Sequence, residues 1–245
     1  MTRPSEPVPI PAIVSDIAGG RPVAAVWVNE LGGLTFEVDG GREYVKVVPP
    51  RWAYHLEAEF ERLRWASAYV LVPHVLGAGD RPPQAVGPPA CEGSAPRLHT
   101  AGLPGRSAVA PRWMADPGTA ARAIGSGLRV LHDALPVDDC PFGPPPWITV
   151  PFPVDRLVVC QGDACAPNTL IDDDGRCCGH VDLGDLGVAD RWADLAVATW
   201  SLGYNYEGDW RAEFFDAYGV APDEERLDYY LRLWEAGDDS AADLR

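Results

Sequence analysis

Two carboxylates and one amide stand where they could share a single cation. Asp163 follows a short apolar run and a glycine, Asn168 comes five residues later, and Asp182 comes nineteen residues after Asp163. Strand-like stretches at 169–172 and 177–182 flank a turn, so we expect a hairpin that returns Asp182 to the level of Asp163 and Asn168. Mg²⁺ takes such oxygen ligands and fills its remaining positions with phosphate and water. A carboxylate not used by the metal could accept a proton from a hydroxyl.

A lysine on a predicted strand supplies the opposite charge. Lysine and arginine together number 20, and Lys46 is the only lysine. It lies in the predicted strand 43–48, and the predicted helix 56–68 offers Glu59 thirteen residues later. Protein-kinase-like phosphotransferases combine such a lysine and glutamate with one aspartate that orients the acceptor and an Asn and Asp that hold Mg²⁺. The residues therefore favour phosphoryl transfer.

The elements that must position these side chains predict an α+β chain of two lobes, 1–101 and 102–245. The first lobe is mainly strands plus one helix, and the second is mainly helices around a short β-rich region. The proline-rich segments 80–97 and 143–155 are expected to be loops, and the last eight residues are expected to fray. The further predicted strands are 23–28, 34–38, 70–79, 98–103 and 157–160, and the further helices are 116–135, 191–202, 209–219 and 223–237.

Composition excludes several functional classes. With 47% hydrophobic residues the chain can bury a sizeable core, and no apolar run reaches the roughly 18 residues of a membrane span. The net charge of −16 argues against nucleic-acid binding and suits a cationic small molecule. The N-terminus lacks a secretory pattern, so we expect a cytoplasmic protein with reduced cysteines. Zinc is disfavoured, because Cys177, Cys178 and His180 have no second ligand pair at a usual spacing.

The segment QGDACAPNTLIDDDGRCCGHVDLGDLGVADRWADLA, residues 161–196, resembles the aminoglycoside phosphotransferase family. The family pattern is His-Gly-Asp, a few residues, Asn, and then Ile-Asp-Leu-Gly. The likeness extends to the nucleotide-covering hairpin and lysine strand (LGGLTFEV and EYVKV), the glutamate helix (LEAEFERLRWAS), the hinge (HTAGLPG) and the C-terminal helix (LDYYLRLWEAG). Within the family, the branch most similar phosphorylates 3′ or 3″ hydroxyls of kanamycin- or streptomycin-like drugs.

The resemblance implies a protein-kinase-like fold and transfer of the γ-phosphate of Mg-ATP to an aminoglycoside hydroxyl, which is an antibiotic-resistance activity. Residues 1–101 would form the nucleotide-binding lobe and residues 102–245 the catalytic and acceptor-binding lobe. The implied roles are Asp163 as the catalytic aspartate, Asn168 and Asp182 as Mg²⁺ ligands, Lys46 on the α- and β-phosphates with Glu59 as its partner, backbone groups of Thr100, Ala101 and Gly102 around adenine, and Asp194 as a support of the catalytic loop.

Four departures from the family pattern keep alternatives open. Gln161 stands where the family has His, and Asp185 stands where relatives often carry Arg. The segment 143–155 replaces a long helical insertion, and 80–97 replaces strands that lead to the hinge. These departures leave room for a kinase of another small hydroxylated metabolite, or for a catalytically impaired kinase-like binding protein.

Two further points stay open at this level. Glu57 and Glu61 flank Glu59, so that glutamate could instead belong to a solvated helix face. The sequence does not decide the acceptor, its hydroxyl, ATP against GTP, or the oligomeric state.

Overall fold

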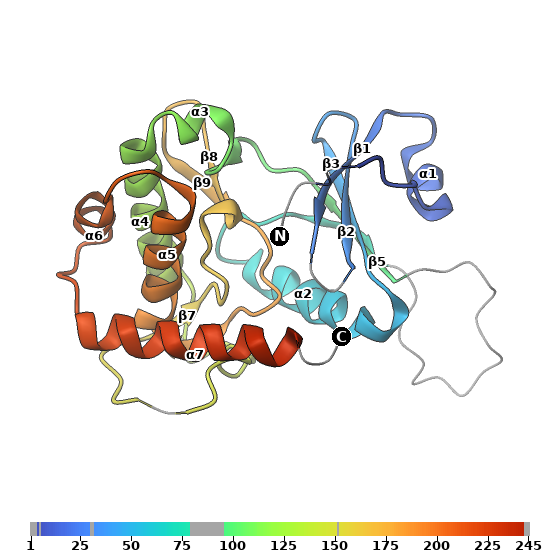
Figure 1. Ribbon diagram of the computed structural model, residues 1–245. Helices are drawn as coiled ribbons and strands as arrows, with labels where there is room; N and C mark the ends of the chain where they lie inside the picture. Colours follow the sequence, from blue (N-terminus) through green and yellow to red (C-terminus); the bar gives the residue numbers. More distant parts are fainter. Residues whose placement is uncertain (1–3, 5, 30–31, 79–95, 151, 243–245) are drawn as a thin grey trace, which may run out of the picture. The chain divides into compact units, whose positions relative to one another are not determined.

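The computed structural model describes residues 4, 6–29, 32–78, 96–150 and 152–242, with side chains as far as 236. The chain divides into two compact units (Figure 1). Unit 1 comprises residues 1–64 and 73–102, and unit 2 comprises residues 65–72 and 103–245. Most of the proline-rich segment 80–97 lies outside the described residues. No helix in the described ranges combines the length and the apolar character that a membrane span requires.

Unit 1 is built on a five-stranded antiparallel sheet in the order β1-β2-β3-β5-β4. The strands are β1 (Val23–Val28), β2 (Leu34–Val38), β3 (Glu43–Val47), β4 (Val75–Ala78) and β5 (Arg97–Ala101). The strands expected at 23–28, 34–38 and 43–48 are therefore confirmed. A short helix, α1 (Ala12–Ala18), was not anticipated, because Pro11 at its N-cap provides no side-chain cap and the helix has only 7 residues.

Alternation along β3 decides where Lys46 lies. Val45 and Val47 are buried with Phe36 and Val38 of β2 in the core that α1 covers. Side chains of a strand alternate between the two faces, so Lys46 projects to the opposite face. There it meets α2 (Ala53–Ala66), which starts three residues before the expected helix. The early start follows from a 3₁₀ turn, Pro50–Trp52, that leads directly into α2.

Glu43, at the start of β3, ties the sheet to the end of α1. Its carboxylate accepts two hydrogen bonds from Arg21 at 2.6 and 3.0 Å and lies 2.8 Å from His99 Nε2. The Arg21 guanidinium, with His99 next, lowers the pKa of Glu43 to about 2. An unfolded Glu titrates near pH ~4.3, so the bonded carboxylate stabilises unit 1 above that pH, and the contribution is lost as the pH falls toward about 2.

Glu43→Gln should therefore lower the free energy of unfolding near neutral pH and flatten its acid dependence. Urea titrations from neutral pH down to acid pH would measure the difference between the parent and the variant. Glu37→Gln, on the neighbouring strand β2, is the control. A parent-to-variant difference that stayed constant across this range would contradict the role of the Glu43 carboxylate.

Unit 2 is mainly helical, with two small antiparallel sheets (Figure 1). Its helices are α3 (Pro111–Met114), α4 (Pro117–Ala134), α5 (Trp192–Asn205), α6 (Arg211–Tyr218) and α7 (Glu224–Ala242). One sheet pairs β7 (Leu157–Cys160) with β10 (Gly187–Asp190), and the other joins β6 (Arg106–Ser107), β8 (Thr169–Ile171) and β9 (Cys177–His180). Antiparallel sheets and helices in separate stretches make the chain α+β, as predicted.

Most sequence expectations for unit 2 are confirmed, with three corrections. Asp116 caps α4 by accepting a hydrogen bond from Thr119 N at 3.3 Å, as its position before Pro117 predicted. The stretch 183–190 was expected to be a loop, but its second half is β10, whose ladder partner β7 lies about thirty residues away in the chain. Strand β6 and helix α3 were also missed. The helix α7 continues to Ala242, so the expected fraying of the last eight residues is wrong for 238–242.

Candidate active site

The loop between β7 and β8 carries the first two candidate residues. Asn168 Nδ2 donates to Asp163 twice, to the backbone oxygen at 2.9 Å and to Oδ2 at 3.0 Å. The 3₁₀ turn Ala166–Asn168 brings the amide back over the aspartate and leads into β8. The other carboxylate oxygen, Asp163 Oδ1, is buried and makes no hydrogen bond of ordinary geometry, and the Cys165 thiol lies beside the carboxyl and acts to lower its pKa. A buried acceptor without a donor is costly, so Oδ1 is suited to receive a hydrogen bond from a ligand.

The hairpin β8–β9 delivers Asp182 to the same place. Thr169 pairs with His180, and Val181 N donates to the Asn168 carbonyl at 2.9 Å, so the chain passes Asn168 just before Asp182. Asp182 has a backbone φ of +59°, in the left-handed region that Asp tolerates better than most residues. Burial raises the pKa of the Asp163 carboxyl, and the charge of Asp182 raises it further. The hairpin thus brings Asp163, Asn168 and Asp182 together, as the spacing predicted.

Gln161 connects the loop that carries Asp163 with the end of the β8–β9 hairpin, which carries Asp182. Its side chain is fully buried; Oε1 accepts from Asp163 N at 2.7 Å, and Nε2 donates to the carbonyl oxygens of Val181 and Asp182 at 3.0 and 3.1 Å. One amide therefore fixes both the backbone of Asp163 and the backbone that carries Asp182. Gln161 fills the supporting position that the family pattern gives to His, with every polar atom of its side chain used.

Asp194, on α5, supports the loop that carries Asp163 by accepting hydrogen bonds from its backbone, as the resemblance predicted. Its Oδ1 accepts from Gly162 N at 3.0 Å, and its Oδ2 accepts from Gln161 N at 2.6 Å. His132 of α4 also lies on Oδ2 at 2.9 Å through Nε2, while its Nδ1 meets the Tyr218 hydroxyl at 2.9 Å. His132 and Tyr218 come from distant elements, and no local pattern in the sequence marks them as members of this network.

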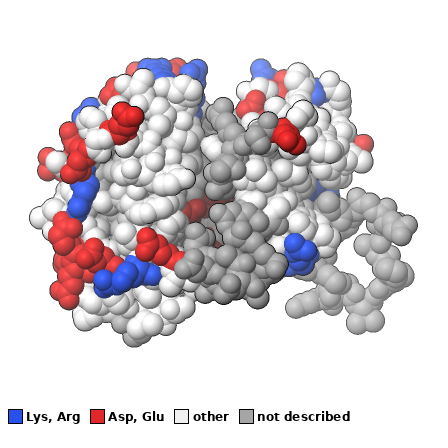
Figure 2. Space-filling view, in the orientation of Figure 1, with Lys and Arg blue, Asp and Glu red and all other residues white. Residues whose placement is uncertain are grey.

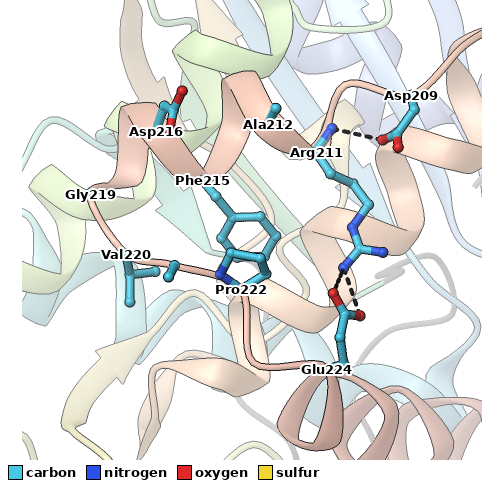
Figure 3. Close-up of a pocket in the computed structure, with 10 residues that line it drawn as sticks. Asp209, Arg211, Ala212, Phe215, Asp216, Gly219, Val220, Pro222 and Glu224 are labelled. Carbon is cyan, nitrogen blue, oxygen red and sulfur yellow. Dashed lines mark hydrogen bonds and ion pairs between the residues drawn. The ribbon is translucent and has the colours of Figure 1, made fainter.

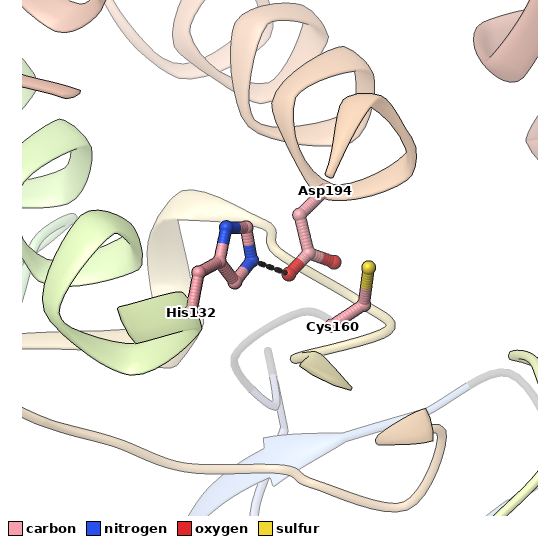
Figure 4. A group of neighbouring side chains, drawn as sticks. All are labelled: His132, Cys160 and Asp194. Carbon is pink, nitrogen blue, oxygen red and sulfur yellow. Dashed lines mark hydrogen bonds and ion pairs between the residues drawn. The ribbon is translucent and has the colours of Figure 1, made fainter. Parts of the chain in front are cut away.

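Cys160 lies beside His132 and Asp194, and the three side chains form a compact buried group (Figure 4). Hydrogen bonds account for each member. Both oxygens of Asp194 are used by the loop and His132, and the Cys160 thiol donates to the Asp190 carbonyl at 3.5 Å. Burial raises the pKa of the Cys160 thiol well above its ordinary value, which keeps sulfur protonated and disfavours metal ligation. The group supports the loop that carries Asp163.

Unit 1 holds the remaining candidates. The ion pair that the resemblance implied is present: Lys46 Nζ lies 2.7 and 2.8 Å from the two carboxylate oxygens of Glu59. The Glu59 side chain is 7% exposed, whereas Glu57 and Glu61 are exposed on the same helix. The structure therefore selects Glu59 among the three glutamates, and the solvated-face interpretation does not hold for it.

Thr100 and Ala101 end β5, beside β3, and Gly102 follows. Ala101 N donates to the His74 carbonyl at 2.8 Å, and Gly102 N donates to the Arg42 carbonyl at 2.7 Å. These two amides are consumed by the fold of unit 1.

A cavity of about 630 Å³ lies between α6 and α7 (Figure 3). None of the candidate residues lines it. Arg211 bridges its acidic wall: the Arg211 amide meets Asp209 at 3.0 Å, and the guanidinium meets Glu224 at 2.6 Å. The Arg211 guanidinium is thus already paired with Glu224. Because no candidate residue lines the cavity, we do not include it in the candidate site.

Comparison with known proteins agrees with this geometry. A family model described as a phosphotransferase enzyme family matches residues 145–230, which include the loop that carries Asp163, the β8–β9 hairpin and α5. The streptomycin 3″-kinase of Streptomyces griseus is 33% identical, over 91% of this chain and 95% of its own length. The chain belongs to the aminoglycoside phosphotransferase family. An aminoglycoside 3′-phosphotransferase of Niallia circulans is 28% identical over 81% of this chain and 85% of its own length.

Solved structures of the family share the fold. Aminoglycoside phosphotransferase APH(3″)-Id from Streptomyces rimosus superposes with a TM-score of 0.68 at 26% identity, covering 91% of this chain and 98% of that one. The same protein in complex with ADP and streptomycin gives a TM-score of 0.63, covering 84% of this chain and 92% of that one. As a family member, the chain is a phosphotransferase with the kinase-like α+β fold. The interpretation as a family member, made from the sequence, is confirmed.

Proposed function

We propose that the chain transfers the γ-phosphoryl group of Mg-ATP to a hydroxyl of a streptomycin-class aminoglycoside. The observation that carries the proposal is the state of Asp163. One of its oxygens is held by Asn168, and the other is buried without a hydrogen bond of ordinary geometry, with only the weak Cys165 thiol donor beside the carboxyl. An acceptor hydroxyl would supply the missing donor, and that bond is the first step of general-base catalysis.

The environment of Asp163 suits this base. Burial and the neighbouring Asp182 raise the pKa of its carboxyl, which makes the carboxylate a stronger base than an exposed Asp. In the proposed reaction the hydroxyl proton passes to Asp163, the hydroxyl oxygen bonds to the γ-phosphorus, and ADP leaves. Gln161 and Asp194 keep the Asp163 backbone fixed while the proton moves.

The donor set beside Asp163 fits a Mg²⁺ ion. Asn168 donates its Nδ2 hydrogens to Asp163, so its Oδ1 is the atom that would bind the ion. Asp182 would add a carboxylate oxygen. Hard oxygen ligands of this kind, few in number, are typical of Mg²⁺ sites completed by phosphate and water. When bound there, Mg²⁺ would neutralise charge on the nucleotide phosphates.

We assign nucleotide binding to residues 1–101 and catalysis with acceptor binding to residues 102–245. Lys46 would contact the α- and β-phosphates, because Glu59 holds its ammonium group in a fixed place on β3. Backbone groups of Thr100 to Gly102 would contact adenine. No disulfide joins the five cysteines of the described residues, which suits the reducing, ATP-containing cytoplasm that we propose as the site of action.

Two observations support a cationic acceptor. The net charge is −16, and acidic side chains gather around α6 and the first turns of α7, where Asp209, Asp216, Glu224 and Glu225 are exposed (Figure 2). A negative surface raises the local concentration of a polycation and its association rate. The S. griseus relative is a streptomycin kinase, and the S. rimosus relative was solved with streptomycin, so we choose streptomycin over kanamycin as the expected acceptor.

Coupled nucleotide turnover by the purified protein, with Mg²⁺ and a panel of streptomycin, kanamycin and neomycin, tests the proposal. We expect turnover that requires streptomycin, with mass spectrometry showing the addition of one phosphate. Turnover with none of the panel, from folded protein that binds ATP, would favour a kinase of another hydroxylated metabolite. Absence of nucleotide binding would favour the impaired binding protein.

Glu59→Gln tests the nucleotide side of the proposal. The substitution keeps the shape but removes the charge that anchors Lys46, so KM for ATP should rise about tenfold, which is about 1.4 kcal/mol. Glu57→Gln, on the exposed face of the same helix, is the matched control and should leave KM unchanged. Steady-state kinetics at saturating acceptor measure both. Equal KM values for the two variants would contradict the role of Glu59.

A further inference from the structure

Trp147 lies in the proline-rich segment before β7 and has no role in the site described above. Its side chain is 9% exposed, and Nε1 donates to the carbonyl oxygen of Gly162 at 2.7 Å. Gly162 immediately precedes Asp163. The segment that stands in place of the family's helical insertion therefore contacts the catalytic loop one residue before the candidate base.

The contact acts on one peptide unit. The Gly162 carbonyl and the Asp163 amide belong to the same rigid plane. Trp147 binds the carbonyl end, and Gln161 Oε1 binds the amide end at 2.7 Å. Two bonds at opposite ends prevent rotation of this plane about the line between its Cα atoms. The Asp163 side chain projects from the Cα at one end of that plane, so the two bonds restrain the backbone from which the carboxylate extends.

Gly162 makes the restraint necessary. Its φ is +92°, and a Cβ at this position would collide with the Asp185 carbonyl, so the loop requires glycine here. Glycine has the largest backbone freedom of any residue, so its order depends on its partners. Asp194 holds its N–H at 3.0 Å, and Trp147 holds its carbonyl.

The segment is itself anchored. Ile148 N donates to the Pro145 carbonyl at 2.9 Å, closing a turn around Trp147, and three consecutive prolines at 144–146 restrict the backbone. Gly143 packs against Gly187 so closely that a Cβ at Gly187 would collide with the Gly143 carbonyl. The indole is therefore presented from a fixed platform that also contacts β10.

We propose that Trp147 is a positioning residue for phosphoryl transfer, which acts through the Gly162 carbonyl to aim the Asp163 carboxylate. The inference rests on the proposed function, in which Asp163 is the base. A merely structural role, filling the core beneath the loop, would need the ring but not the N–H group.

Trp113 provides a matched control. It lies in unit 2, its side chain is 3% exposed, and its buried Nε1 has no hydrogen-bond partner. Trp113→Phe and Trp147→Phe remove the same atoms from buried sites. They differ in that Trp147→Phe also breaks a hydrogen bond to the catalytic loop.

Trp147→Phe is expected to lower kcat by about 10- to 100-fold, because small misplacements of reacting groups are costly, while KM for ATP and for the acceptor stays within about twofold. Trp113→Phe should leave all three constants within about twofold. Replacement of the Trp147 indole by its benzothiophene isostere keeps the ring volume and removes the N–H. That variant decides the matter if Trp147→Phe does not fold. A kcat equal to that of Trp113→Phe would overturn the proposal.

A second readout does not depend on the acceptor. Hydrogen exchange of the Asp163 amide in the free protein, followed by NMR, should be about tenfold faster in Trp147→Phe than in Trp113→Phe, because the peptide unit is released at one end. Absence of aminoglycoside-dependent turnover in the parent protein would overturn the proposed function alone. Equal exchange rates in the two variants would overturn the role of Trp147.

Discussion

Asp163→Asn is expected to lower kcat by roughly 10³-fold and to leave the dissociation constant for ATP within about threefold of the parent value. The amide keeps the shape of the carboxylate, and its oxygen can still accept the hydrogen bond from Asn168. It cannot take a proton from the acceptor hydroxyl. The loss should therefore fall on the chemical step, measured as kcat with saturating ATP and streptomycin.

The same substitution should not destabilise the protein. The Asp163 carboxylate is buried beside a second carboxylate, which is why its pKa is raised, and one of its oxygens makes no hydrogen bond of ordinary geometry. Replacing the charge removes the repulsion from Asp182 and the cost of burying a carboxylate, so we expect an equal or higher thermal midpoint together with the loss of activity. Melting curves without ligand would measure it.

Asp174→Asn provides the control for Asp163→Asn. Asp174 is exposed on the turn of the β8–β9 hairpin, and the same change of charge there should leave both kcat and the midpoint unchanged. A variant at Asp163 that turns over like the parent would show that another group is the base. A large fall in its midpoint would mean that Asp163 serves the fold rather than the reaction.

The sequence predicted the parts of the site that short-range rules govern. Asp163, Asn168 and Asp182 lie on one loop and one hairpin, so spacing and turn residues were sufficient to bring them together. Lys46 and Glu59 lie thirteen residues apart on a predicted strand and a predicted helix, and the structure then chose Glu59 over Glu57 and Glu61. In these cases the geometry of neighbouring elements is nearly fixed by the local chain.

What the sequence could not predict depends on distant contacts. His132 reaches Asp194 across 62 residues, and Tyr218 reaches His132 across 86. The pairing of β10 with β7, and the burial of Trp147 under Gly162, likewise follow from how unit 2 packs. In the sequence, the segment 143–155 shows only a proline-rich loop. A single buried indole N–H, such as that of Trp147, produces no periodic hydrophobic pattern that could mark it.

Asp182→Asn is expected to abolish the Mg²⁺-dependent part of nucleotide binding. Asp182 adopts a φ of +59°, which Asn tolerates as well as Asp, so the variant keeps the backbone and loses the carboxylate ligand. Loss of a charged oxygen ligand weakens a hard cation strongly, and changes even beyond the ligands themselves cost about 10- to 100-fold.

Calorimetric titration of ATP with and without Mg²⁺ separates the metal-dependent binding from the rest. For the parent, Mg²⁺ should tighten ATP binding by at least about tenfold, whereas for Asp182→Asn the two affinities should agree within about twofold. Asp174→Asn, with the same charge change on the same hairpin, should behave like the parent. If Asp182→Asn kept the full Mg²⁺ effect, the ion would have to be held by other groups, and Asp182 would not be its ligand. Because Asp182 also raises the pKa of Asp163, the variant should lower that pKa as well, so nucleotide binding with and without Mg²⁺, rather than turnover, is the measurement that reports on Asp182 as a ligand.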